Sequence, residues 1–280
     1  MGLMVLARAA GLEGTAVHVD HGLRPGSAAE ATVVEEAARW MGFAFAAARV
    51  EVEDGPDLEA RARRARYGVL PPGVLTGHTM DDQAETVLLN LLRGAALDGM
   101  CGMRQPPGGP VGGCVERGVS GPAVRRPLLG IRRAETVEVC RRAGIAPLQD
   151  PTNTHPRYRR NRVRAELLPL LERIAERDVV PVLARQAALV ADDVELLERL
   201  ASELDPTDVA GLRAAPPALA RRALRFWLRA GAGFHPPSSA ELARVMEVVE
   251  GRRRACQISG GRRVTRRAGR LEVSTTGAGD

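Results

Sequence analysis

The sequence predicts an α/β fold, a doubly wound parallel sheet, followed by a smaller, mainly α-helical C-terminal domain that ends in a β meander. Through about residue 150, short β-branched segments alternate with amphipathic helical segments, as strands and crossover helices do in a parallel sheet. After Asp150 the alternation stops and helical periodicity takes over. Between Cys256 and Val273, turns at Gly260-Gly261 and Ala268-Gly269 are typical of antiparallel strands.

The elements of the first part have recognisable start and stop signals. Ser27 and Glu30 form a Ser-x-x-Glu capping box, and Pro71-Pro72 break the arginine-rich helix that Asp57 opens. Glycine and proline are frequent from Pro106 to Gly121, which predicts a mobile loop. We expect strands at residues 15–20, 44–52, 73–76 and 123–129, and helices at residues 2–10, 27–41, 57–70, 79–93 and 132–142.

The C-terminal part is expected to be helical from about Asn161. Its longest amphipathic run, residues 182–204, ends at Asp205-Pro206, and further helices are predicted at residues 216–230 and 238–250. Because the alternation of strands and helices has ended by then, we place the boundary near residue 160. This predicts one domain over residues 1–160 and a second over residues 161–280.

Composition restricts the partners of the chain. All 40 basic residues are arginine, and the formal net charge is +6. Arginine binds phosphate in a forked geometry, so this bias suits an RNA partner, although a GC-rich genome would produce it equally well. Only 3% of residues are aromatic, which argues against RNA-binding folds that stack bases on aromatic rings. Eight arginines and no acid lie between Gly251 and Leu271, either as an RNA-binding surface or as a solvated charge run.

Cysteine usage and hydropathy bear on the compartment. No CxxC pair and no secretory segment occur, which predicts free thiols in a reducing environment for Cys101, Cys114, Cys140 and Cys256. No run approaches the roughly 18 apolar residues that a membrane span needs. We therefore expect a cytoplasmic protein with no membrane partner. The sequence does not determine whether it forms a homodimer.

The stretch from Leu75 to Gly94 is where we expect the chemistry. It is predicted to be a strand end, a turn and a helix capped by Thr79, with Asp82 and Glu85 three residues apart on one face. His78 reaches the same place from the strand. Ligands of parallel sheets bind outside the carboxyl ends of the strands, which is where these side chains lie. The alternative interpretation is that the acids only cap the helix.

This stretch also resembles a known family. HTMDDQAET followed by LLRG resembles the segment that marks the tRNA(Ile)-lysidine synthetases, a branch of the N-type ATP pyrophosphatases. Further stretches resemble the family in the same order along nearly the whole chain: HVDHGLR at 18–24, EARARRARY at 59–67, RPLL at 126–129, and DPTN with YRRNRVRAELLP from 150 to 169. The resemblance implies a ligase that uses ATP and Mg²⁺. Such an enzyme joins L-lysine to C2 of the wobble cytidine in tRNA(Ile) with a CAU anticodon, through an adenylated cytidine, and releases AMP and pyrophosphate.

The resemblance also implies roles for individual residues. Asp82 and Glu85 would hold the lysine amine or the metal, supported by Asp81 and His78, while the metal ligands themselves stay unassigned. Asp20 and His18 would bind the nucleotide. The tRNA would be bound by a helical domain, with contacts from Arg160, Asn161, Arg162 and Arg164. Two alternatives stay open. His18 and His21 are a poor zinc pair that suits a structural role, and the arginines suit an interdomain salt-bridge cluster.

One departure from the family concerns the phosphate-binding loop. The family carries SGGxDS between its first strand and first helix, where backbone N–H groups hold pyrophosphate. This sequence has no such loop and begins with what resembles the helix that follows it. We expect from this a fold that lacks its first strand, binds ATP poorly and is prone to aggregate.

Two other functions compete with lysidine formation. A tRNA thiolase of the same superfamily would rely on cysteine pairs, which this chain lacks. An RNA-binding remnant with impaired catalysis would keep the basic surface and bind tRNA but not ATP.

Overall fold

The structure, a computed structural model, describes residues 1–20, 27–51, 58–104, 113–114, 124–146, 155–229 and 237–275. The chain divides into two compact units, Met1–Val190 and Ala191–Asp280. This division comes about thirty residues later than the boundary at residue 160 that the sequence predicted. The reason is that Val163, Leu168 and Val180 share a hydrophobic core with Ala84 and Leu88 of the first unit. We describe each unit by itself.

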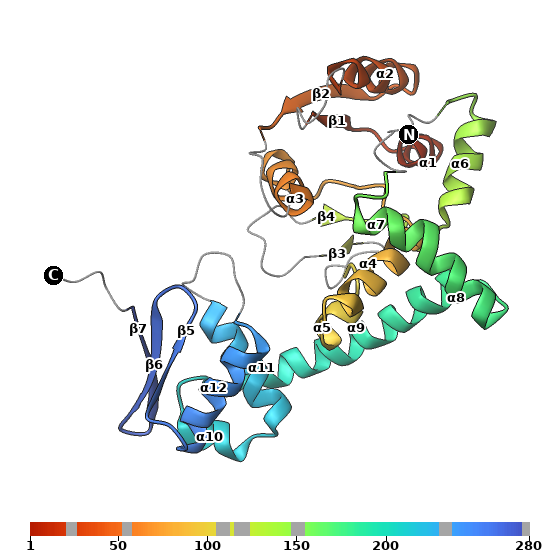
Figure 1. The fold of residues 1–280 in the computed structure, drawn as a ribbon. Coiled ribbons are helices and arrows are strands. Elements are labelled where there is room, and N and C mark those ends of the chain that lie inside the picture. Colours follow the sequence, from red (N-terminus) through yellow and green to blue (C-terminus); the bar gives the residue numbers. More distant parts are fainter. Residues whose placement is uncertain are drawn as a thin grey trace. The chain divides into compact units, whose positions relative to one another are not determined.

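A strand–helix–strand unit opens the parallel sheet, as predicted. β1 (Thr15–Asp20) pairs in parallel with β2 (Ala44–Arg49), in register from Thr15 opposite Ala44 to Asp20 opposite Arg49. The connecting helix α2 (Ser27–Trp40) packs against both strands. Figure 1 shows this helix along the two strands. The predicted capping box at Ser27 lies outside the side chains that the structure describes.

A second parallel pairing leads to the functional stretch. The backbone N–H of Thr76 donates to the Arg125 carbonyl, and the Arg125 N–H donates to the Val74 carbonyl, both at 2.9 Å. The predicted strand over 73–76 is thus reduced to a single bridge at Leu75. The strand predicted over 123–129 is also shorter, since β4 covers only Val124–Arg125. Pro127 lacks an N–H, and the chain then turns, with Leu129 N–H bonded to the Arg126 carbonyl.

Part of the glycine-rich segment that was predicted to be a mobile loop is a strand. β3 (Gly113–Cys114) pairs antiparallel with β4. The remainder of that segment, together with the DPTN motif and His21, lies outside the described residues.

The helices of the first unit surround these strands. α1 (Gly2–Ala9) packs against α6 (Arg133–Arg142). The remaining helices of this unit are α3 (Leu58–Val69), α4 (Met80–Leu92), α5 (Leu97–Met100), α7 (Arg159–Arg162), the π-helical turn η2 (Val163–Leu167), and α8 (Leu168–Ala175). α7 and η2 both contact α4. These contacts bring Arg160 and Arg164, which are distant in sequence, to the start of α4.

The helical spacing of Val87, Leu88, Leu91 and Leu92 predicts one buried face of α4, and the structure agrees with it in part. Val87, Leu88 and Leu89 are buried, whereas Leu91 and Leu92 are exposed. The hydrophobic cluster that covers α4 reaches no further along the helix than Leu89, so its last turn extends beyond this cover. Gly94 follows with a positive φ of 74°, which is the expected conformation at a helix end.

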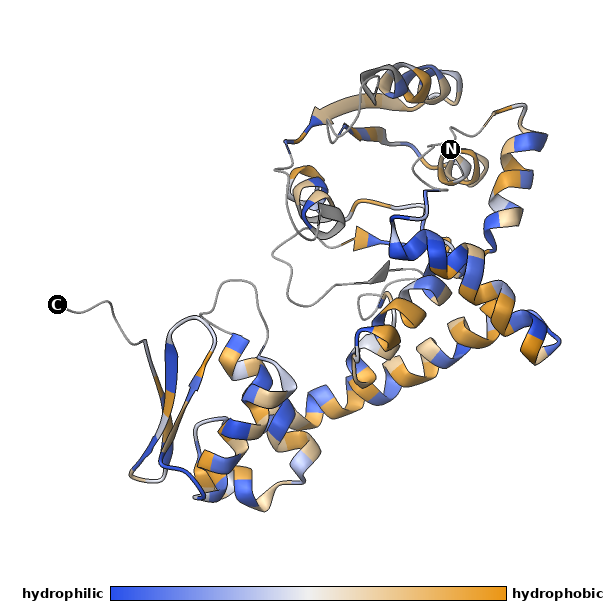
Figure 2. Ribbon diagram, in the orientation of Figure 1, coloured by the Kyte–Doolittle hydropathy of each residue, from blue (hydrophilic) through white to orange (hydrophobic). Residues whose placement is uncertain are grey.

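The second unit follows the predicted order closely. α9 (Val180–Ser202) begins in the first unit, and Figure 2 shows the alternation of hydrophobic and hydrophilic residues along it. The elements that follow are α10 (Val209–Ala214), α11 (Pro217–Arg229), α12 (Ser239–Glu250), and the antiparallel strands β5 (Ala255–Ile258), β6 (Arg262–Arg267) and β7 (Arg270–Thr275). The predicted meander is therefore present. Leu224, Val245, Val249 and Val264, all fully buried, form the centre of the core.

The structure bears on two further predictions, the state of the cysteines and the absence of a membrane span. Cys101, Cys140 and Cys256 are free thiols, as predicted, and all three are buried. Within the described residues, no helix has the length and apolar character to cross a membrane.

Candidate functional site

The site begins with the cap of α4. The backbone N–H and the hydroxyl of Thr79 both donate to Oδ2 of Asp82, at 2.7 Å each. The predicted cap is thus present, with the acid as its acceptor. The cap uses one carboxylate oxygen and fixes the side chain of Asp82, so Oδ1 faces away from the helix end. Three residues later on the same face, Glu85 has a fully buried side chain.

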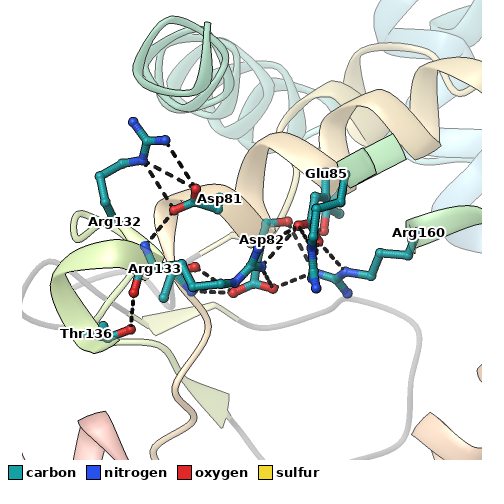
Figure 3. A network of polar contacts seen from close by, with 10 residues as sticks. Asp81, Asp82, Glu85, Arg132, Arg133, Thr136 and Arg160 are labelled. Atoms are coloured by element: carbon teal, nitrogen blue, oxygen red, sulfur yellow. Dashed lines mark hydrogen bonds and ion pairs between the residues drawn. The ribbon is translucent and has the colours of Figure 1, made fainter. Parts of the chain in front are cut away.

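Three arginines from two other segments converge on these acids (Figure 3). Arg133, in the first turn of α6, donates from Nη2 to Oδ1 of Asp82 at 2.9 Å and to Oε1 of Glu85 at 3.0 Å. Arg160 donates from Nε to Oε2 of Glu85 at 2.6 Å and from Nη2 to Oδ1 of Asp82 at 3.0 Å. Arg164 donates to both oxygens of Glu85, at 2.7 and 3.2 Å. We call these five residues the carboxylate–arginine cluster.

The charges of the cluster explain how Asp82 stays ionised inside the protein. Burial alone would raise the pKa of Asp82, but Arg133, Arg160 and the two hydrogen bonds from Thr79 outweigh it and lower that pKa to about 2. The same pairing raises the pKa of the Arg133 guanidinium, although burial opposes it. Three guanidinium groups face two carboxylates, so the cluster carries one net positive charge.

Asp81 lies beside the cluster and anchors α6. Its Oδ2 accepts the backbone N–H of Arg133 at 2.7 Å, and its carboxylate also pairs with the side chain of Arg132. Arg132 in turn pairs with Asp178. Burial raises the pKa of Asp81, but these hydrogen bonds and charges lower it overall. Asp81 therefore holds the start of α6 against the start of α4.

His78 and the end of β1 supply the remaining predicted residues. The Nδ1 atom of His78 lies 2.8 Å from the hydroxyl of Thr76, which orients the imidazole at the strand–helix junction. Burial lowers the pKa of His18, and the charge of Asp20 partly opposes this effect. Both residues point to the same face of β1, because they are two positions apart. Their role near a nucleotide stays a prediction.

The residues from Arg160 to Arg164, which we call the RNxxR segment after their sequence pattern, lie in three different environments. Arg160 and Arg164 point into the cluster, as described above. Asn161 is buried and donates to the carbonyl of His155 at 2.9 Å, which holds the preceding loop. Arg162 points elsewhere and pairs with Glu166 on the exposed side of the helix. The four residues predicted to bind tRNA therefore lie in different environments.

Arg132 and Arg133 were not identified from the sequence. One signal could have found them, since two arginines in the first turn of a helix oppose the helix dipole. Such an arrangement is unfavourable unless acidic partners lie close by, and Asp81, Asp82 and Glu85 are those partners.

The fit of a metal ion and of a nucleotide can be tested on these residues. The described residues contain no group of three or more histidine, cysteine or acidic side chains that could hold a metal ion. In the cluster, the acids are already surrounded by three cations, so it does not fit Mg²⁺. On α3, Arg61 has buried Nε and Nη2 atoms, and Arg66 a buried Nε, that find no hydrogen-bond partner in the described part of the chain. Donors of this kind fit the phosphates of ATP.

Comparisons with known proteins agree with this arrangement. Residues 2–171 match the PP-loop domain family, and residues 208–272 match the TilS substrate binding domain. The tRNA(Ile)-lysidine synthase of Salinispora tropica is 42% identical over 294 residues, covering 98% of this chain and 84% of the relative. That of Mycolicibacterium paratuberculosis is 44% identical over 229 residues, covering 78% and 67%. A solved U34-tRNA thiolase from Methanococcus maripaludis aligns with a TM-score of 0.48 and 13% identity over 69% of this chain and 68% of that one, too little to bear on function.

Proposed function

Because this chain belongs to the tRNA(Ile)-lysidine synthase family of PP-loop proteins, we propose that it ligates L-lysine to the wobble cytidine of tRNA(Ile) with a CAU anticodon. The reaction would consume ATP in two steps: the oxygen at C2 of the cytidine takes the adenylyl group and pyrophosphate leaves, and the lysine amine then bonds to C2 as AMP leaves with that oxygen. The match to the PP-loop domain supports the use of ATP, and the match to the substrate binding domain supports the tRNA. An RNA substrate and buried free thiols favour action in the cytoplasm.

The observation that carries this proposal is the position of Asp82 and Glu85. Two carboxylates at the start of α4 form ion pairs with guanidinium groups inside the protein, which means that the site binds cationic nitrogen. The substrate to be joined, lysine, presents a primary ammonium. The pKa of Asp82, about 2, makes this residue a poor proton acceptor at neutral pH. We infer that Asp82 and Glu85 orient lysine as carboxylates and leave removal of its proton to another group.

The arginines of the RNxxR segment are proposed to have two tasks. Arg160 and Arg164 fix the geometry of Glu85, which is the positioning that catalysis by orientation needs. Arg162 is exposed and so is the member of this segment best placed to contact an RNA phosphate. Asn161 supports them through its bond to the preceding loop.

The second unit supplies further basic side chains for RNA. Arg263, Arg266 and Arg267 of β6 are exposed and have no acidic partner within the described residues. Arg262 is different, since it is buried and donates to the carbonyls of Leu228 and Ser259. The three exposed arginines are proposed to contact the phosphate backbone.

For the nucleotide, we propose Asp20, His18 and the two arginines of α3. Asp20 and His18 lie at the end of β1, where ligands of parallel sheets bind. The buried donors of Arg61 and Arg66 would bind the phosphates. When bound, ATP supplies the adenylyl group that activates the cytidine. The involvement of Mg²⁺ rests on the family alone, and no step is assigned to it here.

The direct test is incorporation of radiolabelled L-lysine into transcribed tRNA(Ile) by the 280-residue chain. We expect slow incorporation, because the sequence contains no SGGxDS loop to hold pyrophosphate. It should require ATP and the cytidine of the CAU anticodon, so a transcript with a UAU anticodon should stay unlabelled. Binding of the transcript with no ATP-dependent incorporation would instead identify an RNA-binding remnant.

A further inference from the structure

One nitrogen atom of Arg133 occupies a special position in the carboxylate–arginine cluster. Its Nη2 contacts both acids at once, Oδ1 of Asp82 at 2.9 Å and Oε1 of Glu85 at 3.0 Å. Arg160 also reaches both acids, but it does so through two different nitrogens, Nε and Nη2. The contacts of Arg164 with the acids are to Glu85 alone. A single cationic nitrogen between two carboxylates is the arrangement that a primary ammonium would adopt.

The charge of the cluster then limits what can bind there. With three guanidinium groups and two carboxylates, the site already has an excess of positive charge. Adding an ammonium would place a fourth cation among them, in a region where Glu85 is fully buried and charges interact strongly. A cationic substrate can bind with favourable electrostatics only if one of the arginines leaves.

Arg133 is the arginine best placed to leave. Both of its contacts with Glu85 are 3.0 Å or longer, whereas Arg160 and Arg164 each hold Glu85 through a shorter bond. Its side chain is 31% exposed, compared with 20% for Arg160 and 33% for Arg164, so Arg133 has a path to solvent, and only its longer contacts with Glu85 distinguish it from Arg164. Its backbone N–H stays bound to Asp81, which would keep α6 in place while the side chain moves.

We propose that Arg133 is a positioning residue that occupies the place of the substrate ammonium until lysine displaces it. This inference rests on the proposed function, in which Asp82 and Glu85 bind lysine. In the free protein the guanidinium of Arg133 holds both carboxylates in place. Lysine binding is then an exchange of one cation for another, and its apparent affinity is reduced by the fraction of molecules in which Arg133 fills the site.

The test is titration of the full chain with L-lysine by calorimetry, comparing wild type with Arg133→Gln. If Arg133 fills the site in about nine molecules of ten, its removal should lower the apparent Kd for lysine about tenfold. In steady-state assays the KM for lysine should fall and kcat should fall as well, because the acids lose a positioning contact. Arg142→Gln, which removes an exposed arginine of the same helix that pairs with Glu138, should leave both constants unchanged.

If Arg133 had a purely structural role, its removal would leave the affinity for lysine unchanged or lower it. A folded Arg133→Gln variant that binds lysine as weakly as wild type, or more weakly, would overturn the inference. The variant Glu85→Gln separates this outcome from failure of the proposed function. If Glu85→Gln binds lysine like wild type, the acids are not the lysine site and both claims fall. If only Glu85→Gln loses binding and Arg133→Gln gains nothing, the inference alone fails.

A measurement on the unaltered protein covers the case in which Arg133→Gln does not fold. In ¹⁵N spectra of the arginine side chains, addition of L-lysine should shift the Nε–H signal of Arg133, assigned by its loss in Arg133→Lys. The signals of Arg160 and Arg164 should move less, since their contacts with Glu85 are kept. A saturating addition of lysine that shifts Arg160 or Arg164 and leaves Arg133 unmoved would contradict the exchange.

Discussion

Helix α4 of the first unit and helix α12 of the second begin with the same arrangement of side chains. In α4 the N–H and hydroxyl of Thr79 donate to Asp82, and in α12 those of Ser238 donate to Glu241, all at 2.7 Å. Burial opposes ionisation of both acids, yet the pKa of each is lowered to about 2. The charges of Arg133 and Arg160 and the hydrogen bonds from Thr79 lower the pKa of Asp82, whereas hydrogen bonds from Ser238 and Ser259 lower that of Glu241. The cap of α12 has one further bond, from the N–H of Glu241 to the hydroxyl of Ser238 at 3.2 Å.

The difference lies in what the rest of each carboxylate contacts. Glu241 receives a further hydrogen bond from the backbone N–H of Ser259, a neutral donor that ties β5 to α12. Asp82 instead faces two guanidinium groups and shares them with the buried Glu85. Capping accounts fully for Glu241 but leaves the arginines around Asp82 unexplained. The comparison indicates that the start of α4 is a cation-binding site in addition to a cap, which is what the proposed function requires.

The largest expected effect is on unfolding free energy, which we expect to fall more for Glu85→Gln than for Glu241→Gln. Replacing Glu85 by Gln leaves three guanidinium groups facing one carboxylate, Asp82, and should cost the first unit about 3–5 kcal/mol of unfolding free energy. Glu241→Gln removes an acceptor of neutral donors and should cost the second unit about 1–3 kcal/mol. Chemical denaturation, followed by probes in each unit, measures both. Equal losses would mean that the arginines contribute nothing beyond ordinary pairing.

A second comparison uses activity. Asp82→Asn keeps the shape of the side chain but weakens its hold on a cation, and misplacement of a reactant should lower kcat/KM for lysine about 100-fold. Glu241→Gln, assayed at a temperature where it is folded, should keep its activity. Lysine incorporation into tRNA(Ile) at several lysine concentrations gives both values. A similar decrease in the two variants would show that Asp82 acts only as a cap.

Acid should affect the two helices to different extents. The pKa of each acid is lower in the folded protein than in the unfolded chain, where about 3.9 for Asp and 4.3 for Glu are usual, so its stabilisation is present above pH 4. That stabilisation is lost as the pH falls toward 2, by about 2–3 kcal/mol for Asp82. Protonation of Asp82 also removes one ion-pair partner from Arg133 and from Arg160, whereas α12 loses only a cap. Unfolding free energy measured from pH 5 to 2 should therefore decline more steeply for the first unit. Parallel declines would contradict this.

The sequence predicted the local features of the site and could not predict the distant ones. The turn, the cap at Thr79 and the shared face of Asp82 and Glu85 follow from spacing within one helix. The partners of these acids do not, because Arg133 lies 48 residues from Glu85 along the chain, and Arg164 lies 79 residues away. Only the order of the family motifs indicated that the RNxxR segment belongs to the site.

The same distinction applies to the fold. Helices and the C-terminal meander were predicted well, since periodicity and glycine turns are local signals. The domain boundary came out too early, because helical periodicity around residue 165 does not reveal which core receives Val163 and Leu168. Strand lengths near Leu75 and Arg125 depend on pairing partners and were overestimated.

The smallest expected effect concerns RNA binding by single arginines. Arg267→Gln removes an exposed guanidinium of β6, so the slope of log K for tRNA against log salt should fall by about 0.7–0.9 if that side chain contacts one phosphate. Arg141→Gln, an exposed arginine that pairs with Glu138 in the first unit, should leave the slope unchanged. Fluorescence anisotropy between 50 and 300 mM salt, roughly the range in which phosphate contacts dominate, measures the slopes. Identical slopes in wild type and Arg267→Gln would remove β6 from the RNA-binding surface.

The most direct test of the central claim, that the start of α4 binds a cation and the start of α12 does not, is lysine binding itself. Calorimetric titration with L-lysine should give a measurable heat of binding for wild type and for Glu241→Gln. A folded Asp82→Asn variant should give none. Wild-type affinity for lysine in Asp82→Asn would contradict the account and leave Asp82 as a helix cap.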